Sequence, residues 1–287
     1  MSGQEDERIV EMLNEDIKGE HAAIVQYLRH AYAMGEGEMA CEIEAIARDE
    51  MRHLEWLSEA VAELDGEPTI ERGEMTIGGS SIAEWMQRDV GLEQDAIALY
   101  EEHIAAIDDP KIKRLLRRIV SDETSHLHDF EHFVEKSKKK DLQPMAPLEA
   151  PAGKPGKLAD MLNWGVRHEY TVILQYLYHS FMTPDEEVSE EMQDQAINEM
   201  QHLGWLAEEL TDGGNVPEIE ETGVDRSRDT ADMLRADIAV EREVIKEYTR
   251  QIDEVDDPDL KRLITRIRDN EIYHDELFTD LLDEVSD

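Results

Sequence analysis

DEMRHLEWL, residues 49–57, contains a glutamate and a histidine three positions apart, Glu50 and His53. On a helix, positions i and i+3 lie on one face, so the two side chains can reach a single point. The same spacing occurs three more times in the chain, at Glu123/His126, Glu199/His202 and Glu271/His274. Carboxylate and imidazole groups are common ligands of iron and manganese, so this spacing on helices indicates metal binding.

The four pairs belong to a long internal repeat. Residues 198–206, NEMQHLGWL, match residues 49–57 at an offset of 149. Residues 252–274 match residues 104–126 at an offset of 148, with about half of the positions identical. Repetition over such a length indicates duplication of a whole domain. We therefore expect one domain at 1–137, a Pro-, Gly- and Lys-rich linker at 138–156 and a second domain at 157–287.

Apolar periodicity and capping residues predict four helices in each half. Ser81 with Glu84 resembles a capping box, and Asp109-Pro110, Thr183-Pro184 and Asp257-Pro258 each place a capping residue before a proline. The longest connections follow the second helix of each half, as a bundle with one crossover requires. The expected fold class is all-α, with two tandem four-helix bundles that have one long crossover each. The predicted helices span 5–33, 38–65, 81–107, 110–136, 156–182, 184–211, 229–255 and 258–284.

Composition excludes several classes of protein. The 287 residues are long enough for two buried cores, and the net charge of −41 argues against binding to nucleic acid or to anionic lipid. We attribute most of this charge to solvated helix faces. Cys41 is the only cysteine, which excludes an intrachain disulfide and a cysteine-ligated metal knuckle. With no signal-like start and no membrane-length apolar run, the chain is expected in the cytoplasm.

Two further glutamates in each half complete a set of six candidate ligands. Glu20 aligns with Glu169, and Glu93 aligns with Glu241 through LEQDAIALY and VEREVIKEY. Four carboxylates and two neutral imidazoles balance the charge of two divalent ions. The candidates are Glu20, Glu50, His53, Glu93, Glu123 and His126 in the first half, and Glu169, Glu199, His202, Glu241, Glu271 and His274 in the second.

Four segments of the first half resemble bacterioferritin and its ferritin-like di-iron relatives. They are GEHAAIVQY (19–27), DEMRH (49–53), DVGLEQD (89–95) and DETSH (122–126), and the resemblance extends to both halves as a tandem duplication. It implies a ferroxidase centre in each half that binds two Fe(II) ions and oxidises them with dioxygen or hydrogen peroxide. Glu50 and Glu123 would bridge the ions together with Glu20 and Glu93, and each histidine would bind one ion.

The resemblance carries expectations about haem and assembly. Met51 and Met200 occupy the position of that family's haem-ligating methionine, so they could hold one haem between the halves; packing is the alternative. The family's short fifth helix has no counterpart before Asp287. We therefore expect an intrachain pseudo-dimer, or a homo-oligomer smaller than a 24-subunit cage.

The leading functional hypothesis is a ferroxidase that acts in iron detoxification. Alternatives are a dimanganese catalase-type enzyme, a di-iron peroxidase and a non-catalytic iron-storage component. Tyr27 and Tyr176 repeat, and both a core position and a hydrogen-bonding role near the ligands stay open. Trp56 and Trp205 repeat and are expected to pack in the core. The remaining histidines are not expected to have counterparts in the other half, and we expect them at the surface or beside the ligands. They are His21, His30, His103, His128, His132, His168 and His179.

Overall fold

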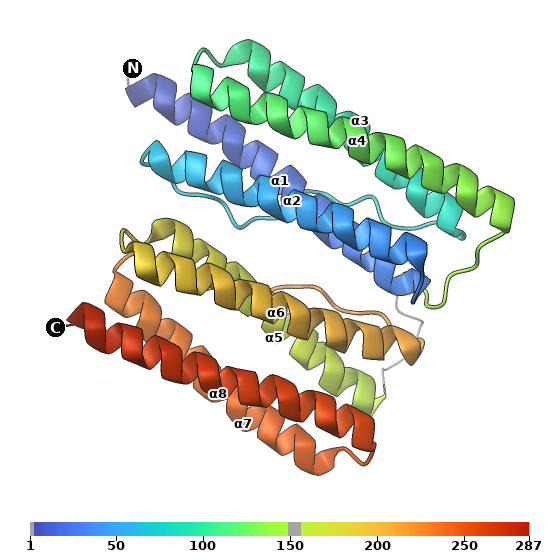
Figure 1. Ribbon diagram of the computed structural model, residues 1–287, viewed down its shortest axis with the longest axis vertical. Helices are drawn as coiled ribbons and strands as arrows, with labels where there is room; N and C mark the ends of the chain where they lie inside the picture. The colour runs from blue at the N-terminus through green and yellow to red at the C-terminus, as the bar shows by residue number, and fades with distance from the viewer. Residues whose placement is uncertain (1–2, 149–155, 287) are drawn as a thin grey trace. The chain divides into compact units, whose positions relative to one another are not determined.

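The computed structural model describes residues 3–148 and 156–286, and within these ranges all regular structure is helical (Figure 1). The chain separates into two compact units, the first built on α1–α4 and the second on α5–α8. This confirms the predicted fold class. The helices are α1 (Gly3–Met34), α2 (Glu38–Glu63), α3 (Ile82–Ala106), α4 (Pro110–Lys140), α5 (Lys157–Met182), α6 (Glu186–Asp212), α7 (Thr230–Glu254) and α8 (Pro258–Ser286).

Three of the four predicted capping residues begin a helix: Ser81 begins α3, Asp109 begins α4 and Asp257 begins α8. The Asp109 carboxylate accepts hydrogen bonds from the backbone N–H groups of Lys111 and Ile112, at 2.7 and 3.0 Å, and Asp257 caps α8 in the same way. The Ser81 hydroxyl accepts from Glu84 N–H at 3.3 Å. The Glu84 carboxylate bonds to Ser80 N–H rather than to Ser81, so the capping box is only half formed.

All but one of the predicted helix limits lie within two residues of the observed ones, and two of the differences have an identifiable cause. The helix expected to begin at residue 184 begins at Glu186, because Asp185 rather than Thr183 caps it by accepting from Val188 N–H at 3.1 Å. The first half's last helix continues past residue 136 to Lys140. Lys138, Lys139 and Lys140 form its last turn, where cationic side chains are favourable, and Asp141 ends it with a φ of 50°. Residues 149–155 of the predicted linker lie outside the described residues.

In the first unit, α1 packs along α2 and α3 packs along α4 (Figure 1). The core consists of two apolar clusters, one around Tyr27, Trp85 and Phe130 and the other around Leu13, Leu57 and Leu116. On every helix of the unit, the predicted ligands fall between the residues that join one cluster and those that join the other. The predicted ligands therefore form a polar layer between two apolar ones.

The long crossovers connect α2 to α3 and α6 to α7, and side chains of the first helix of each unit hold them in place. Asn14 bonds to the backbone of Glu67 and Thr69 at 3.0 and 2.8 Å, and Gln26 accepts from Thr76 N–H at 2.8 Å. In the second unit, Asn163 and Gln175 do the same for Glu218 and Asp225. No helix among the described residues is both long and apolar enough to cross a bilayer.

Candidate metal centres

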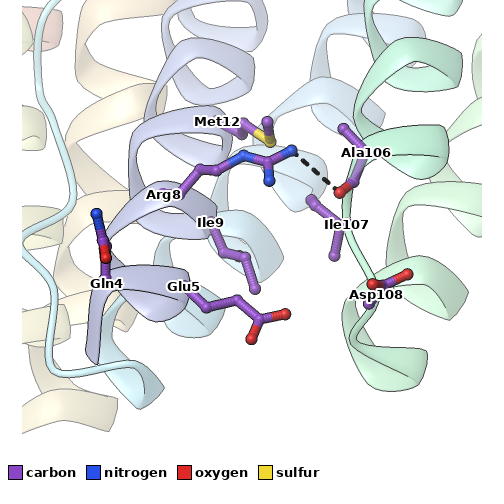
Figure 2. A pocket seen from close by; sticks show the side chains of 8 residues that line it. All are labelled: Gln4, Glu5, Arg8, Ile9, Met12, Ala106, Ile107 and Asp108. Carbon is purple, nitrogen blue, oxygen red and sulfur yellow. Dashed lines mark hydrogen bonds between the residues drawn. The ribbon is translucent and has the colours of Figure 1, made fainter. Parts of the chain in front are cut away.

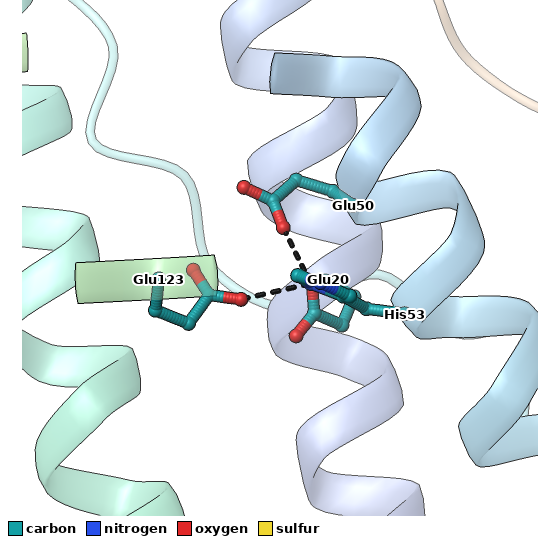
Figure 3. Close-up of side chains that lie close together, drawn as sticks. All are labelled: Glu20, Glu50, His53 and Glu123. Carbon is teal, nitrogen blue, oxygen red and sulfur yellow. Dashed lines mark ion pairs between the residues drawn. The ribbon is translucent and has the colours of Figure 1, made fainter. Parts of the chain in front are cut away.

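In the first unit, all four helices contribute to one buried cluster of acidic and imidazole side chains. α1 supplies Glu20 and α3 supplies Glu93, while α2 and α4 supply the two Glu-x-x-His pairs, and none of the six residues is more than 4% exposed. Figure 3 shows Glu20, Glu50 and Glu123 converging on His53 from three helices. The sequence prediction thus named six residues that the fold brings together.

The six residues form two overlapping groups of four. One contains Glu20, Glu50, His53 and Glu123; the other contains Glu50, Glu93, Glu123 and His126. Ligand atoms within each group lie within 4.8 Å of one another. Glu50 and Glu123 belong to both groups, so they occupy bridging positions between two potential ion sites.

The histidine rings face these bridging carboxylates with Nδ1. His53 Nδ1 lies 2.9 Å from both Glu50 Oε2 and Glu123 Oε1, and His126 Nδ1 lies 3.0 Å from Glu50 Oε1. Nδ1 is therefore the ring atom placed to bind an ion.

The second unit repeats the arrangement. Its two groups are Glu169, Glu199, His202 and Glu271, and Glu199, Glu241, Glu271 and His274, with every member buried. Nδ1 of His202 lies 2.7 Å from Glu199 and 3.0 Å from Glu271. Glu199 and Glu271 are shared between the groups, as Glu50 and Glu123 are in the first unit.

Ligand atoms that lack a hydrogen bond indicate that each cluster is suited to hold cations. Buried carboxylates need compensation, yet several inward-facing atoms of both clusters have no hydrogen-bond partner. Bound cations would satisfy these atoms and offset the four carboxylates of each cluster. The atoms without a hydrogen bond are Oε1 and Oε2 of Glu50, Oε2 of Glu93 and Glu241, Oε1 of Glu123, Glu199 and Glu271, and Nδ1 of His53, His126 and His274.

Burial and the charges of neighbouring carboxylates shift the pKa values of the ligand side chains. Burial, followed by the charges of Glu123 and Glu50, holds the pKa of Glu20 well above its usual range, and Glu169 in the second unit behaves alike. Burial alone would lower the pKa of His126, but the carboxylates of Glu123 and Glu50 outweigh it and raise the pKa to about 10. The metal-free clusters therefore retain protons that a bound cation would replace.

Two buried tyrosines adjoin each cluster. The Tyr27 hydroxyl donates to Glu93 at 2.5 Å, and Tyr176 donates to Glu241. This favours the hydrogen-bonding role over a purely apolar one. Tyr100 donates to Glu20 and Tyr248 donates to Glu169, and the sequence interpretation missed both. Their repeat register, an offset of 148 within aligned segments, was the signal that could have found them.

The expectation for the remaining histidines is partly wrong. His30 and His179 are fully buried and lie 149 positions apart, so they do repeat. His30 Nδ1 lies 2.8 Å from Asp89 and His179 Nδ1 lies 3.0 Å from Asp237. Gln26 and Gln175 donate to the same aspartates, so each unit contains a second buried polar network. In contrast, His128 and His132 are exposed as expected.

The repeated tryptophans and methionines are only half-buried. Trp56 and Trp205 lie between a site histidine and an arginine, with the guanidinium of Arg118 or Arg266 above the ring at 4.0 or 4.3 Å. They pack at the edge of the core rather than inside it. Met51 and Met200 are also half-buried, and their haem role stays a prediction.

A separate cavity of about 350 Å³ lies at one end of the first unit (Figure 2). Residues of α1 and of the α3–α4 connection line it, and Arg8 crosses it to donate to the carbonyl oxygen of Ala106 at 3.1 Å. None of the predicted ligands lines this cavity. It is therefore not part of either metal centre.

Two four-helix units, each with a buried layer of four carboxylates and two imidazoles, define the class of ferritin-like di-metal bundles. Comparison with known families agrees, because the Ferritin-like domain family matches residues 10–139 and again residues 159–287. The chain belongs to this family.

Its relatives include bacterioferritins. The bacterioferritin of Desulfovibrio desulfuricans is 31% identical over 142 residues, covering 46% of this chain and 79% of that protein. Bacterioferritin BfrA of Mycobacterium tuberculosis is 32% identical over 139 residues, covering 46% and 87%. A crystal structure of the Desulfovibrio protein, which describes its diiron site in different catalytic states, matches 54% of this chain and 96% of that chain, with 28% identity and a TM-score of 0.46.

Proposed function

We propose that each unit binds two Fe(II) ions and oxidises them with dioxygen or hydrogen peroxide, as a ferroxidase in iron detoxification. The observation that carries the proposal is the pair of overlapping ligand groups in each unit, which share two glutamates. Membership of the ferritin-like family and the similarity to bacterioferritins support the choice of iron. The twelve predicted ligands would hold these ions.

The residues of the first unit have distinct tasks in this reaction. Glu50 and Glu123 would contribute ligands to both ions, while Glu20 with His53 would complete one ion site and Glu93 with His126 the other. The tyrosine hydroxyls of Tyr100 and Tyr27 orient the terminal carboxylates of Glu20 and Glu93. The bound iron would supply one electron per Fe(II) to the oxidant.

The same donor atoms support a second candidate. Carboxylate and imidazole ligands suit manganese as well as iron, so a dimanganese centre that disproportionates peroxide remains the alternative, beside a di-iron peroxidase and a storage component without catalysis. Haem on Met51 and Met200, a cytoplasmic location and an intrachain pseudo-dimer stay proposals that the resemblance supports. A Soret band and metal analysis of freshly purified protein would separate iron, manganese and haem.

Anaerobic titration with Fe(II) tests the centres directly. We expect saturation at four ions per chain, and at two ions when Glu50→Gln and His53→Gln are combined, because the second unit keeps its own ligands. His128→Gln with Glu131→Gln is the matched control, since this pair has the same three-residue spacing but is 86% and 55% exposed. It should retain four ions. Four tight ions in the Glu50/His53 variant would contradict the assigned ligands.

A further inference from the structure

The two centres differ in the side chains that lie next to Nε2 of their histidines. In the first unit, Nδ1 of each ring faces the cluster and Nε2 faces outward. His53 Nε2 lies 3.5 Å from Asp122 Oδ2, and His126 Nε2 lies 3.5 Å from Asp49 Oδ2. These aspartates are 43% and 36% exposed and immediately precede the bridging glutamates in the sequence. Each potential metal-binding imidazole thus has a carboxylate on its far side.

In the second unit, the corresponding residues are asparagines. Asn270 takes the place of Asp122 and Asn198 takes the place of Asp49. Asn270 Nδ2 lies 2.9 Å from His202 Nε2, whereas the Asn198 amide donates to Asp194 O and Gln195 Oε1, at 3.0 and 3.2 Å. Across residues 3–148 and 156–286, no carboxylate contacts Nε2 of either second-unit ligand histidine.

This difference changes how strongly the imidazoles can bind a cation. An ion on Nδ1 requires the ring proton to remain on Nε2, where a carboxylate accepts it and increases the basicity of the ligand. An amide is a neutral acceptor, and Asn270 would have to turn its oxygen toward His202 to serve as one. Loss of such a partner typically lowers metal affinity about 10–100-fold.

The effect acts through the histidines rather than through long-range attraction. Arg52 pairs with Asp49 and is replaced by Gln201 in the second unit, so the second unit lacks the cation as well as the anion. Arg52 also offsets part of the charge that Asp49 offers to His126. We therefore expect Asp122 to contribute more than Asp49. The outer face also differs, because exposed Ile197, Ile272 and Tyr273 replace Arg48, Thr124 and Ser125.

We propose that the two di-metal centres are graded, with the first-unit centre binding divalent cations more tightly and filling before the second. Asp49 and Asp122 act as positioning residues that set this order, and Asn198 and Asn270 make the second centre the weaker one. The inference rests on the proposed function, because it requires both clusters to bind metal.

Titration of the full chain with Mn(II), followed by electron paramagnetic resonance of the free ion, tests the grading without turnover. We expect two tight ions and two that bind about 10–100-fold more weakly in the wild type. Combining Asp49→Asn with Asp122→Asn should lower the affinity for the two tightly bound ions. Asp122→Asn should account for most of this loss. Asn270→Asp should raise the affinity for the two weakly bound ions, and misfolding cannot produce such a gain. Glu7→Gln with Glu11→Gln removes two exposed carboxylates from α1 and should change neither class.

Two results would overturn the grading while leaving the centres themselves intact. One is a single class of four equivalent ions in the wild type. The other is two classes that neither the aspartate nor the asparagine exchanges alter. Absence of Mn(II) binding in the wild type would instead reject the metal centres, and the grading with them.

Discussion

The histidine ligands control the response of metal binding to pH. In the metal-free protein, burial lowers the pKa of His274, but the charge and hydrogen bond of Glu199 outweigh it and raise the pKa to about 12; His126 reaches about 10. Both rings are therefore protonated at pH 7. An ion that binds Nδ1 must displace a proton, so metal binding releases protons.

We predict that affinity falls as the pH is lowered, by about tenfold per pH unit for each proton displaced. The sign follows because lower pH favours the protonated, metal-free form of each histidine. Calorimetric titration with Mn(II) in two buffers of different ionisation enthalpy measures the number of protons released. Binding at pH 7 with no proton release would show that the rings are already neutral in the free protein.

The sequence predicted the ligands far better than their surroundings. Glu50 and His53 were visible because helix geometry fixes which residues share a face, and the repeat then selected Glu93 and Glu241 among many acidic residues. Tyr100 was missed although it repeats as Tyr248, since its hydroxyl reaches a glutamate on another helix and no local motif records that contact. The exchange of Asp122 for Asn270 is visible in the sequence, but its meaning depends on which ring nitrogen faces outward.

At the scale of the elements, capping side chains define where helices begin. The Asp109 carboxylate accepts two backbone hydrogen bonds at the start of α4, the helix that carries Glu123 and His126. We predict that Asp109→Ala lowers the free energy of unfolding by about 0.5–2 kcal/mol. Urea denaturation of the metal-free protein provides the measurement.

The neighbouring residue offers a matched control for this prediction. Asp108 has the same side chain, is 93% exposed and caps no helix. Asp108→Ala should therefore change stability by less than about 0.5 kcal/mol. Equal losses from the two substitutions would mean that charge, rather than the cap, accounts for the effect.

Helix positions were predictable from periodicity, while the end of α4 and the start of α6 were harder to place. The lysines at 138–140 resemble a linker in composition, yet they extend α4 because they complement the negative end of the helix. Thr183-Pro184 has the form of a helix start, but Asp185 provides the cap that the structure uses. At the end of α4, a linker-like composition competes with favourable helix-end charges, and at the start of α6 two residues compete as the cap. The local sequence does not show which one is stronger.

At the scale of the whole molecule, each unit carries a buried layer of polar atoms, several of which have no hydrogen bond. Such atoms oppose folding, and bound cations would satisfy them. We predict that chelation lowers the unfolding temperature and that Mn(II) restores it. Free metal at 100 times its dissociation constant adds about 2.7 kcal/mol for one site. Thermal unfolding followed by circular dichroism measures both steps.

A variant that lacks one bridging carboxylate in each unit is the control for this effect. Glu50→Gln with Glu199→Gln removes a residue shared by both ligand groups of its unit. The unfolding temperature of this variant should respond much less to metal. A wild-type protein that binds Mn(II) with no rise in unfolding temperature would show that the folded and unfolded chains bind the ion equally well.

Covalent duplication frees the two bundles from the symmetry that constrains identical subunits. In a homodimer of single bundles, every substitution appears at both centres, so a change that tunes one necessarily alters the other. Here Asn198 and Asn270 occur in one copy only, while Asp49 and Asp122 persist in the other. The two centres of one polypeptide can therefore acquire different properties, and the two kinds of centre are always present in equal number.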